Sequence, residues 1–566
     1  MNPRPIGYWL TIEYRFLLVS LNIDAVLEEV TISQRKKKLD QMIQGRGLRD
    51  AYSATLARIK AQKGSKARLG IEVLMWLSHS ERPLNANELC HALGVEVGST
   101  NLDSQNIPAI ETLLGCSFGL VTVEASTYTV RLVHYTLQEY LSKNTDLFYS
   151  PHSAIAQTCL TYLNFQFIRD LPPTLGVSSP TTPLLEYASC YWGTHARREM
   201  AESVNTLALR LLDEFDRHVS SRMLLSCDSE DPYALYVSSQ DMHRQDMHRV
   251  LRSRSRMGFT GLHGAAYLGI KEILVSLLEM KKWDLGATDV GGNTAIMWAA
   301  IRGHEDIVKI LLEQEDVAPD TASNSGQRPL SWAARNGHEG IVKFLLARRD
   351  VAPNTADKGG RTPLSWAARN EHEGVVKILL EWGDITPNTA DKSGQTPLSL
   401  AAQLGNENVV KMLLERKDIT PNTADKGGRT PLSWVAGTRS GYVVKMLLKR
   451  EDVAPNTADR NGETPLSWAA KLGMHQATKI LLEQQDVVPD TADKDGRTPL
   501  SWAAGNGYER VVRLLLARGD VSPDTPDNEG RTPHSWAADR GHIGVMRMLQ
   551  ERSRVSYDIE MTESPN

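Results

Sequence analysis

Apolar positions repeat along more than half of the chain with a period of 34 residues. In a typical unit, the run Thr362 to Ala368 reads Thr-Pro-Leu-Ser-Trp-Ala-Ala and is followed by a second apolar run, Val375 to Leu380. The glycine that opens each unit stands at positions 258, 292, 326, 360, 394, 428, 462, 496 and 530. Because self-similarity at a fixed period of this length is typical of solenoids, the pattern predicts nine stacked units.

Each unit predicts two short helices and an extended arm. Thr362 is placed to cap a first helix that begins at Pro363, where the missing N–H has no intrahelical acceptor anyway. The second helix presents its apolar residues on one face, as at Val375, Val376, Leu379 and Leu380. One unit cannot bury that face alone, so we expect the repeats to fold through the interfaces between units.

The residues before the repeats predict a small mixed domain followed by helices. Helical runs and two β-rich runs occur in the order helix, helix, helix, hairpin, helix, at about 67–77, 86–93, 107–114, 120–132 and 134–141. This order is that of a winged helix. The whole chain therefore predicts a mainly α protein with six segments: helical 1–66, winged helix 67–143, helical 144–215, a linker 216–257 with at most one helix, repeats 258–552 and a disordered tail 553–566.

Composition limits the class of partner and the compartment. The 64 basic and 68 acidic residues give a net charge of −4, so no global attraction to nucleic acid or membrane is expected. The five cysteines show no paired spacing, which is typical of a reducing compartment. The apolar run 16–21 is too short to span a membrane. These features predict a cytoplasmic protein, with a nuclear location as the alternative. The basic run 35–38 has two interpretations, a localisation signal or a solvated helix face.

The repeated motifs resemble those of the ankyrin repeat. The resemblance rests on T-P-L-x-x-A-A, on G-H-x-x-x-V-K-x-L-L and on an Asp-x-x-Gly hairpin tip, as at 357–360. It implies a solenoid that binds proteins through a groove lined by hairpin tips and by the ends of the first helices. The chain departs from the usual ankyrin pattern in two ways. The period is one residue longer than usual, with the extra residue in the arm near Pro353. The histidine of the usual T-P-L-H motif is kept only at His263, and serine replaces it in most units.

The N-terminal region has a second resemblance, to the winged helix that follows the nucleotide-binding module in fungal NACHT–ankyrin signalling proteins. It rests on Leu56 to Trp76, Arg82 to Leu89, Leu120 to Val123 and Val133 to Leu141. That winged helix carries the family label GPI inositol-deacylase, which implies no deacylase activity here. The phosphate-binding motif G-x-x-x-x-G-K-[ST] does not occur in the chain. Either the lineage lost the NTPase module, leaving 1–66 as a helical remnant, or Met1 is an internal or misassigned start.

The motifs that could carry chemistry are weak, and we expect no catalytic, cofactor or metal site. Gly115 to Gly119 matches G-x-S-x-G, but a helix precedes the serine and a strand follows it, the reverse of a nucleophile elbow. Pairs such as His338-Glu339 lack the second histidine of a zinc helix. The tandem at 241–249 carries two histidines but has the composition of a solvated linker. Helices 86–93 and 107–114 contain no Lys or Arg, so DNA binding by the winged helix is not expected.

The residues that vary between units are the candidates for recognition. They lie at the hairpin tips, just after the opening glycine and at the ends of the first helices: Lys358, Arg361, Arg369, Lys392, Gln403, Lys426, Arg429, Arg460, Lys471, Lys494 and Arg497. Since most are basic, they predict an acidic protein partner; the alternative is that these are exposed positions free to drift. The predicted function is a non-catalytic scaffold, with the sensor half of a NACHT-type signalling NTPase as the alternative.

Tryptophan recurs at 298, 332, 366, 434, 468, 502 and 536, with Leu400 in one unit. The row is either packing between units or a stacking platform for nucleic acid or peptide. Because leucine replaces tryptophan once, packing is favoured. We expect Trp366→Leu to cost little stability and Trp366→Ala to cost a few kcal/mol, measured by chemical denaturation. Equal losses from the two variants would contradict the packing interpretation.

Overall fold

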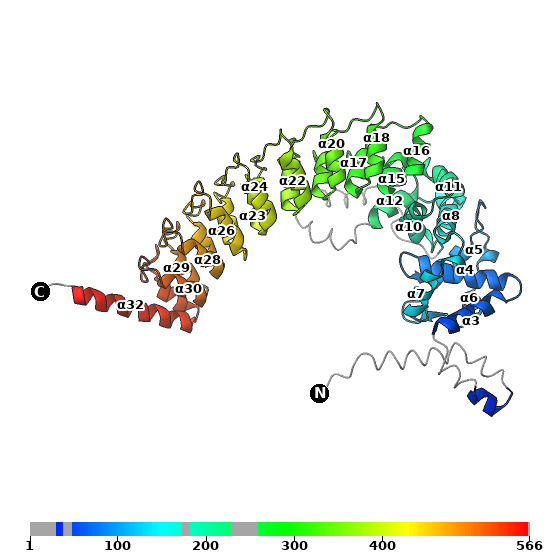
Figure 1. The fold of residues 1–566 in the computed structure, drawn as a ribbon, viewed down its shortest axis with the longest axis horizontal. Helices are drawn as coiled ribbons and strands as arrows, with labels where there is room; N and C mark the ends of the chain where they lie inside the picture. Colours follow the sequence, from blue (N-terminus) through cyan, green and yellow to red (C-terminus); the bar gives the residue numbers. More distant parts are fainter. Residues whose placement is uncertain (1–29, 38–47, 173–180, 228–257, 564–566) are drawn as a thin grey trace. The chain divides into compact units, whose positions relative to one another are not determined.

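The computed structural model describes residues 30–37, 48–172, 181–227 and 258–563 (Figure 1). Its contacts divide the chain into two compact units, Met1–Gly291 and Gly292–Asn566. Helices dominate both, and in the described residues one small sheet, in the N-terminal unit, holds the strands. No helix in the described ranges combines the length and the apolar character that a bilayer crossing requires.

The N-terminal unit begins with the predicted winged helix. Its helices are α3 (Leu48–Lys60), α4 (Ser65–His79), α5 (Ala86–Gly94), α6 (Ile110–Cys116) and α7 (Tyr135–Lys143). The hairpin of β2 (Val121–Glu124) and β3 (Thr129–Leu132) confirms the prediction, with Val123 opposite Val130. The short strand β1 (Leu84–Asn85), which was not predicted, adds to β3 and gives the order β1-β3-β2.

The helix expected over 107–114 begins three residues later. A 3₁₀ turn, η1 (Ser104–Asn106), precedes it, and Ala109 is still extended. The residue before Pro108 is disfavoured in the α region, which explains the delay. Helix α5, by contrast, starts as expected because Asn85 and Glu88 form a reciprocal capping box.

A helical segment follows, comprising η2 (Thr145–Leu147), α8 (Pro151–Leu163), α9 (Gln166–Arg169), α10 (Leu185–Arg198), α11 (Glu202–Leu212) and α12 (Val219–Cys227). Helices α8 and α10 pack along each other and bury Leu160 and Trp192 completely. Helix α12 lies inside the stretch expected to be a linker, and its Leu224 is buried. The rest of that stretch, 228–257, with the histidine tandem, lies outside the described residues, as do the apolar run 16–21 and Lys38 of the basic run.

The first repeat belongs to the N-terminal unit, although we expected a boundary before Gly258. Its helices, α15 (Gly261–Leu268) and α16 (Lys271–Glu279), pack against α11. The rings of Phe215 and Phe259 lie 6.0 Å apart, and Tyr267 Oη donates to the Leu224 carbonyl at 3.4 Å. The helical segment thus closes the apolar face that the first repeat would otherwise expose.

The C-terminal unit is a stack of eight helix pairs, all within the described residues. The first helices are α17 (Ala295–Arg302), α19 (Pro329–Arg335), α21 (Pro363–Arg369), α23 (Pro397–Leu404), α25 (Pro431–Ala436), α27 (Pro465–Lys471), α29 (Pro499–Gly505) and α31 (Pro533–Asp539). The second helices are α18 (Glu305–Leu312), α20 (Glu339–Leu346), α22 (Glu373–Glu381), α24 (Glu407–Leu414), α26 (Gly441–Leu448), α28 (His475–Leu482), α30 (Glu509–Leu516) and α32 (Ile543–Glu563). First helices contact first helices and second helices contact second helices, so the unit has two layers.

The local rules expected for each repeat are confirmed. Thr362 Oγ1 accepts from the Ser365 backbone N–H at 3.2 Å, and the two hydroxyls lie 3.0 Å apart. Val375, Val376 and Leu379 are fully buried. His263, which keeps the family's histidine, reaches farther than serine: its Nδ1 lies 2.8 Å from Thr260 Oγ1 and its Nε2 3.1 Å from the Ala287 carbonyl.

The turn between the two helices has a positive φ in most repeats; in the repeat starting at 428, Arg439 stands at this position without one. Gly303 has φ 78°, and the equivalent glycines repeat this conformation. Where the repeat starting at 360 lacks that glycine, Glu371 adopts φ 63°, a conformation that a residue with a Cβ seldom takes. The next residue, His372, lies 2.8 Å through Nε2 from the carbonyl of Arg335 in the preceding repeat. The recurring histidine therefore belongs to the turn, as expected, and links neighbouring repeats.

Asparagine side chains join each arm to the next. Asn456 Nδ2 donates to the Asp486 carbonyl at 2.6 Å, and Asn456 Oδ1 accepts from the Val488 N–H at 3.0 Å. The same pair of bonds is made by Asn354, Asn388 and Asn422. We call this arrangement the asparagine clamp. One amide thus satisfies a donor and an acceptor of the neighbouring backbone.

Arginine side chains also join neighbouring repeats. Arg348 binds Asp350 with two parallel bonds of 2.8 Å and donates through Nη1 to the Leu312 carbonyl at 3.0 Å. This holds the pKa of the Asp350 carboxyl below its usual value. Arg416, Arg450 and Arg518 repeat the arrangement. Each arginine therefore caps the C-terminal carbonyls of the second helix in the preceding repeat.

The last repeat has the polar outer surface expected of a capping unit. Arg547 and Gln550 are exposed on α32, and Gln550 Nε2 lies 3.1 Å from His534 Nε2. The predicted disordered tail differs from the structure, because α32 continues without interruption from Ile543 to Glu563.

Aspartate replaces the clamp asparagine at Asp320 and at Asp490, and the second replacement provides a test. Asp490 replaces the asparagine; its Oδ2 accepts from the Ser522 N–H at 2.7 Å, but its buried Oδ1 has no hydrogen-bond partner in the described residues. Burial raises the pKa of this carboxyl. We expect Asp490→Asn to raise the free energy of unfolding at pH 7 by about 1–2 kcal/mol, because an amide supplies the missing donor.

The gain should shrink as the pH falls, since a carboxyl whose folded pKa is raised takes up its proton first in the folded state. Urea denaturation at pH 7 and at acidic pH measures both effects. Asn456→Asp is the reciprocal control and should destabilise at pH 7. A neutral or destabilising Asp490→Asn would contradict this account of the clamp.

Candidate partner-binding surface of the repeats

Most arms end in a tight hairpin built on one aspartate; Ser323 stands at this position in the arm before Gly326. The Asp357 N–H donates to the Arg361 carbonyl at 3.0 Å. Asp357 Oδ1 accepts from the N–H groups of Gly359 and Arg361 at 2.8 and 2.9 Å. Gly360 completes the turn with φ 83°, which explains why glycine opens every unit. The hairpin therefore presents the residue after the aspartate at its tip.

Neighbouring tips are joined by backbone hydrogen bonds. The Lys392 N–H donates to the Gly359 carbonyl at 2.8 Å, and equivalent bonds start from Lys358, Lys426, Arg460, Lys494 and Asn528. The side chains at the first five of these tips are exposed cations: Lys358, Lys392, Lys426, Arg460 and Lys494. We call these five residues the tip row. The bonds between tips hold the five charges in a line, one per repeat.

A second row, of tryptophans, lies behind the hairpins. Trp366 Nε1 donates to Asp357 Oδ2 at 3.0 Å, so one carboxylate holds both the hairpin and the indole. The bond recurs at Trp434, Trp468, Trp502 and Trp536 with the aspartate nine residues earlier. Trp298, Trp332 and Trp366 are buried, and the later four are half-buried.

Cationic side chains stack on these rings. Arg335 lies over both Trp332 and Trp366, at 5.1 and 4.3 Å from the ring centres. Lys471 lies over Trp468 and Trp502 at 5.1 and 4.2 Å. Arg429 and Arg497 bridge successive tryptophans in the same way. The result is a ladder in which cations and indoles alternate, an arrangement stabilised by the ring quadrupole.

Within the C-terminal unit, the repeat that has Leu400 in place of tryptophan also lacks the stacked cations. Leu400 occupies the ring position, and the residues at the two cation positions are Gln395 and Gln403, whose side chains lie 3.3 Å apart. Three positions have therefore changed together, from aromatic and charged to aliphatic and neutral. A tryptophan does not require these cations, however, because the unit of Trp298 has Asn293 and Ile301 at the two cation positions.

The predicted binding residues thus fall into two groups. Lys358, Lys392, Gln403, Lys426, Arg460 and Lys494 are exposed, whereas Arg361, Arg369, Arg429, Lys471 and Arg497 are half-buried. Of the second group, Arg361 stacks on Trp366 at 4.8 Å. Sequence reasoning did not separate the groups, and it missed the aspartates, although their fixed spacing from tryptophan was visible.

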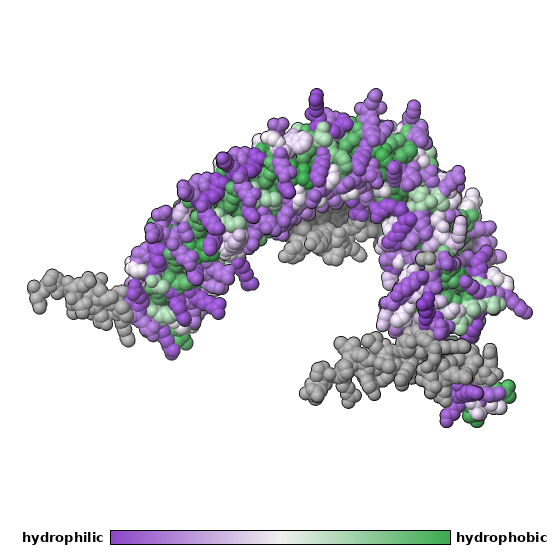
Figure 2. Space-filling model, viewed as in Figure 1, coloured by the Kyte–Doolittle hydropathy of each residue, from purple (hydrophilic) through white to green (hydrophobic). Residues whose placement is uncertain are grey.

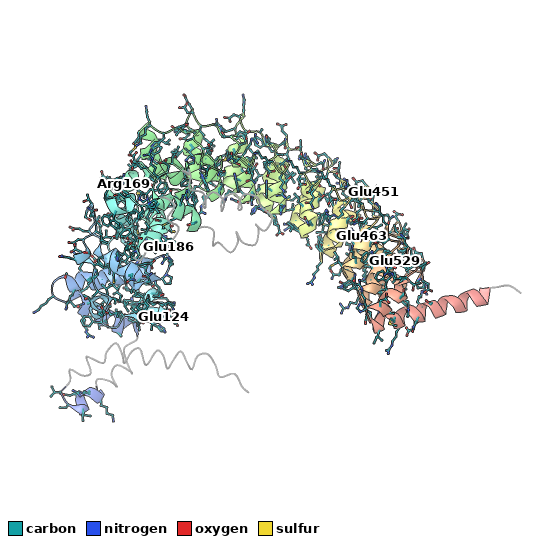
Figure 3. The ribbon with its side chains drawn as sticks, turned by 180° about the vertical axis from the view of Figure 1, so that it is seen from behind. Glu124, Arg169, Glu186, Glu451, Glu463 and Glu529 are labelled. Atoms are coloured by element: carbon teal, nitrogen blue, oxygen red, sulfur yellow. The ribbon has the colours of Figure 1, made fainter. Side chains whose placement is uncertain are left out.

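Acidic partners further reduce the free charge of the ladder. Glu463, which is almost fully buried, pairs with Lys471 at 2.5 Å. Glu529 pairs with Arg531 at 2.5 Å, and Figure 3 labels both glutamates in the repeats. Asp391 lies 3.5 Å from Arg361. Ladder cations are therefore compensated within the protein, unlike those of the tip row.

The tryptophan row packs between units, as favoured from the sequence, but it is also polar. Replacing Trp366 by leucine removes the indole N–H from Asp357 and the ring from Arg335 and Arg361. Trp366→Leu should therefore lower the free energy of unfolding by more than the loss of packing volume alone would, but by less than Trp366→Ala does.

In Figure 2 hydrophilic residues dominate the visible surface of the repeats, with apolar residues in narrow bands among them.

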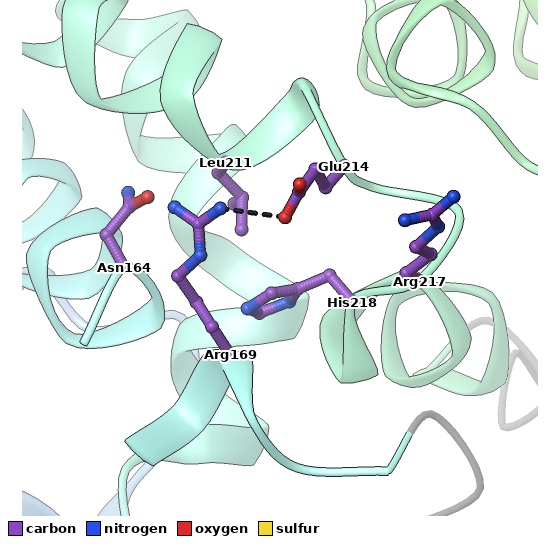
Figure 4. A pocket seen from close by; sticks show the side chains of 6 residues that line it. All are labelled: Asn164, Arg169, Leu211, Glu214, Arg217 and His218. Carbon is purple, nitrogen blue, oxygen red and sulfur yellow. Dashed lines mark hydrogen bonds and ion pairs between the residues drawn. The ribbon is translucent and has the colours of Figure 1, made fainter. Parts of the chain in front are cut away.

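A small polar cavity lies among the described residues of the N-terminal unit. Asn164 and His218 contribute to a cavity of about 30 Å³, beside the 2.9 Å ion pair of Arg169 and Glu214 (Figure 4). This volume suits an ordered water rather than a small molecule. Burial lowers the pKa of His218 to about 4, so the ring is neutral at pH 7.

Ser117 of the G-x-S-x-G motif and several cysteines of this unit are buried in its core. Ser117 is fully buried, and its hydroxyl donates to the Leu113 carbonyl at 2.7 Å, so it is not placed as a nucleophile. Cys90, Cys116 and Cys159 are buried free thiols, and burial raises the pKa of Cys90 to about 11. Cys190 is disulfide-bonded, which differs from the unpaired cysteines expected from the sequence.

Comparison with known families assigns the repeats. The model described as ankyrin repeats (3 copies) matches residues 262–357, 349–425, 418–492 and 484–561, which together cover more than half of the chain. The chain belongs to the ankyrin-repeat family. Ankyrin repeats are protein-interaction modules and are typically non-catalytic. The exposed tip row therefore lies on a protein-interaction module.

A second family model, described as GPI inositol-deacylase, winged helix domain, matches residues 55–152. The match covers α4 to α7 and the three-stranded sheet, so it confirms the winged helix N-terminal to the ankyrin repeats. It begins inside α3, before the boundary expected at residue 67. No curated protein matches the chain.

The two groups of cations can be distinguished within one ankyrin hairpin. Arg429 stacks on Trp434 at 3.7 Å and pairs with Asp425, whereas Lys426, three residues earlier, is exposed. We expect Arg429→Ala to lower the free energy of unfolding by about 1–2 kcal/mol, and Lys426→Ala to change it by less than about 0.5 kcal/mol. The urea midpoint and slope of each variant measure this; equal effects would refute the division.

Proposed function

We propose that the chain is a non-catalytic scaffold that binds an acidic protein partner through its ankyrin repeats. The observation that carries the proposal is the tip row, in which five exposed cations stand in register at the ends of successive hairpins. A protein segment with several carboxylates matches such a line. Complementary charge of this kind accelerates association and selects the partner.

The ladder cations are poor candidates for the same task. Arg429 and Lys471 already face indole rings and carboxylates, so a partner would have to replace those contacts. The tip lysines are exposed, so a partner carboxylate can approach them without disturbing the fold. Gln403 lies exposed at the end of α23 and provides a neutral hydrogen-bonding position among the units. Recognition by this surface therefore centres on the hairpins.

A cytoplasmic location, with a nuclear one as the alternative, belongs to this proposal, as does the absence of catalysis. The burial of Ser117 supports the latter, because it removes the single serine motif that resembled a hydrolase.

The second candidate is the sensor half of a NACHT-type signalling NTPase. The observation that favours it is the winged helix at 55–152 N-terminal to the repeats, the order of domains in the NACHT–ankyrin proteins that the sequence resembles. In that case the tip row would receive the signal and the winged helix would pass it to a nucleotide-binding module.

The transcript discriminates between the two candidates. Sequencing of full-length transcripts from native cells would show whether a reading frame with a phosphate-binding loop continues into Met1. Such a frame favours the sensor, and a verified start at Met1 favours the scaffold.

Charge reversal tests the tip row. We expect Lys358→Glu, Lys392→Glu and Lys426→Glu together to reduce partner capture from native extract by at least about tenfold, with a smaller difference at high salt. The matched control reverses Lys377, Lys411 and Lys445, three exposed lysines with the same spacing on the second helices. Equal capture by the tip variant and the wild-type chain, or equal loss in both variants, would overturn the assignment.

A further inference from the structure

Three side chains from separate elements of the N-terminal unit converge at one point. Glu81 lies between α4 and β1, His152 is the second residue of α8, and His195 is in the last turn of α10. One atom from each can be chosen so that all lie within 4.8 Å of one another. The two imidazoles face each other through Nδ1, with the nitrogens 2.8 Å apart.

The orientation of the His195 ring is fixed, with Nδ1 facing His152. The ring is fully buried, and its other nitrogen, Nε2, lies 2.9 Å from Tyr187 Oη. The same phenol oxygen accepts from the Glu81 N–H at 3.1 Å, so Tyr187 holds the histidine and the glutamate together. A second hydrogen-bond partner on the far nitrogen is the usual device that orients a metal-binding histidine.

The carboxylate is fixed as well. Arg198, one turn after His195, reaches both oxygens of Glu81. The neighbouring Glu199 accepts from the Ser153 N–H at 3.0 Å, which anchors the start of α8 beside α10. Each Glu81 oxygen keeps a lone pair that a guanidinium bond does not use.

The two imidazoles cannot both be cations, because their facing nitrogens lie 2.8 Å apart, too close for each to carry a proton. Two neutral rings at this distance share one proton between the facing nitrogens, or both direct a lone pair at a common ligand. Two nitrogens and one carboxylate oxygen are a common ligand set for Zn²⁺, whereas Mg²⁺ and Ca²⁺ prefer oxygen alone.

We propose that Glu81, His152 and His195 bind one Zn²⁺ ion, with water as the fourth ligand. Tetrahedral geometry with Zn–N bonds of about 2.0–2.1 Å places ligand nitrogens about 3.3 Å apart, so the rings need to separate by only about half an ångström. The site joins the segment after α4 of the winged helix to α8 and α10. Zinc bound there would fasten the winged helix to the helical segment that closes the first ankyrin repeat.

Zinc binding to the purified full chain tests the site. After removal of metal with a chelator, we expect the chain to take up one Zn²⁺ per molecule in calorimetry and in metal analysis of the dialysed protein. We also expect the thermal midpoint to rise with Zn²⁺ and not with Mg²⁺. His152→Ala and Glu81→Gln should each weaken zinc binding by at least about tenfold, with the metal-free midpoint retained.

The control is His475→Ala, which removes an exposed histidine of the repeats and should leave zinc binding unchanged. Absence of stoichiometric binding, or binding that survives both site variants, would overturn the proposal and leave a hydrogen-bonded histidine pair. If the site variants do not fold, Co²⁺ bound to the wild-type chain decides. Intense visible bands without a sulfur charge-transfer band support a four-coordinate nitrogen and oxygen site, and a pale six-coordinate spectrum refutes it.

Discussion

No repeat of this protein can bury its own apolar face, and the rest of the structure follows from that constraint. Each helix pair is completed by the next pair, and the polar groups follow the same rule. The asparagine clamp, the arginine caps, the turn histidines and the tips all bond to backbone atoms of a neighbouring repeat, between 30 and 37 residues away. Stability is therefore located in the interfaces, and the ends need special cover.

The two ends solve this problem differently. At the first repeat, α11 and α12 of the helical segment cover the face, with Phe215 against Phe259. At the last repeat, α32 has Gln550 where the preceding second helices have leucine, and it continues well beyond its neighbours in length. One end is capped by another part of the chain, and the other by a change of composition.

Residues of one chemical type have two roles in the repeats, and position decides between them. Arg429 and Lys426 stand three residues apart in the same hairpin, yet one is stacked between rings and the other projects into solvent. The hairpin aspartates make this separation possible, because each fixes its turn and its indole with a single carboxylate. The charge available to a partner is therefore much smaller than the number of basic residues implies.

The local features were predictable because they depend on neighbours in sequence. The cap at Thr362, the hairpin of β2 and β3 and the positive-φ glycines follow from local sequence preferences. Glu371 was not recognised at its strained turn, since the stack imposes that conformation. Helix α12 and the attachment of the first repeat depend on tertiary packing of a segment with weak periodicity. The meeting of Glu81, His152 and His195 has no spacing signal at all, because three separate elements bring them together.

The register of the contacts between repeats has a consequence for the history of the chain. Because each kind of bond joins fixed positions of two neighbouring repeats, removal or duplication of one whole internal unit rebuilds the same set of bonds at the new junction. Unequal recombination between such similar segments can therefore lengthen or shorten the row of hairpins without unfolding the product. The number of cations offered to a partner is then set by genetic copy number, and selection can adjust it one unit at a time.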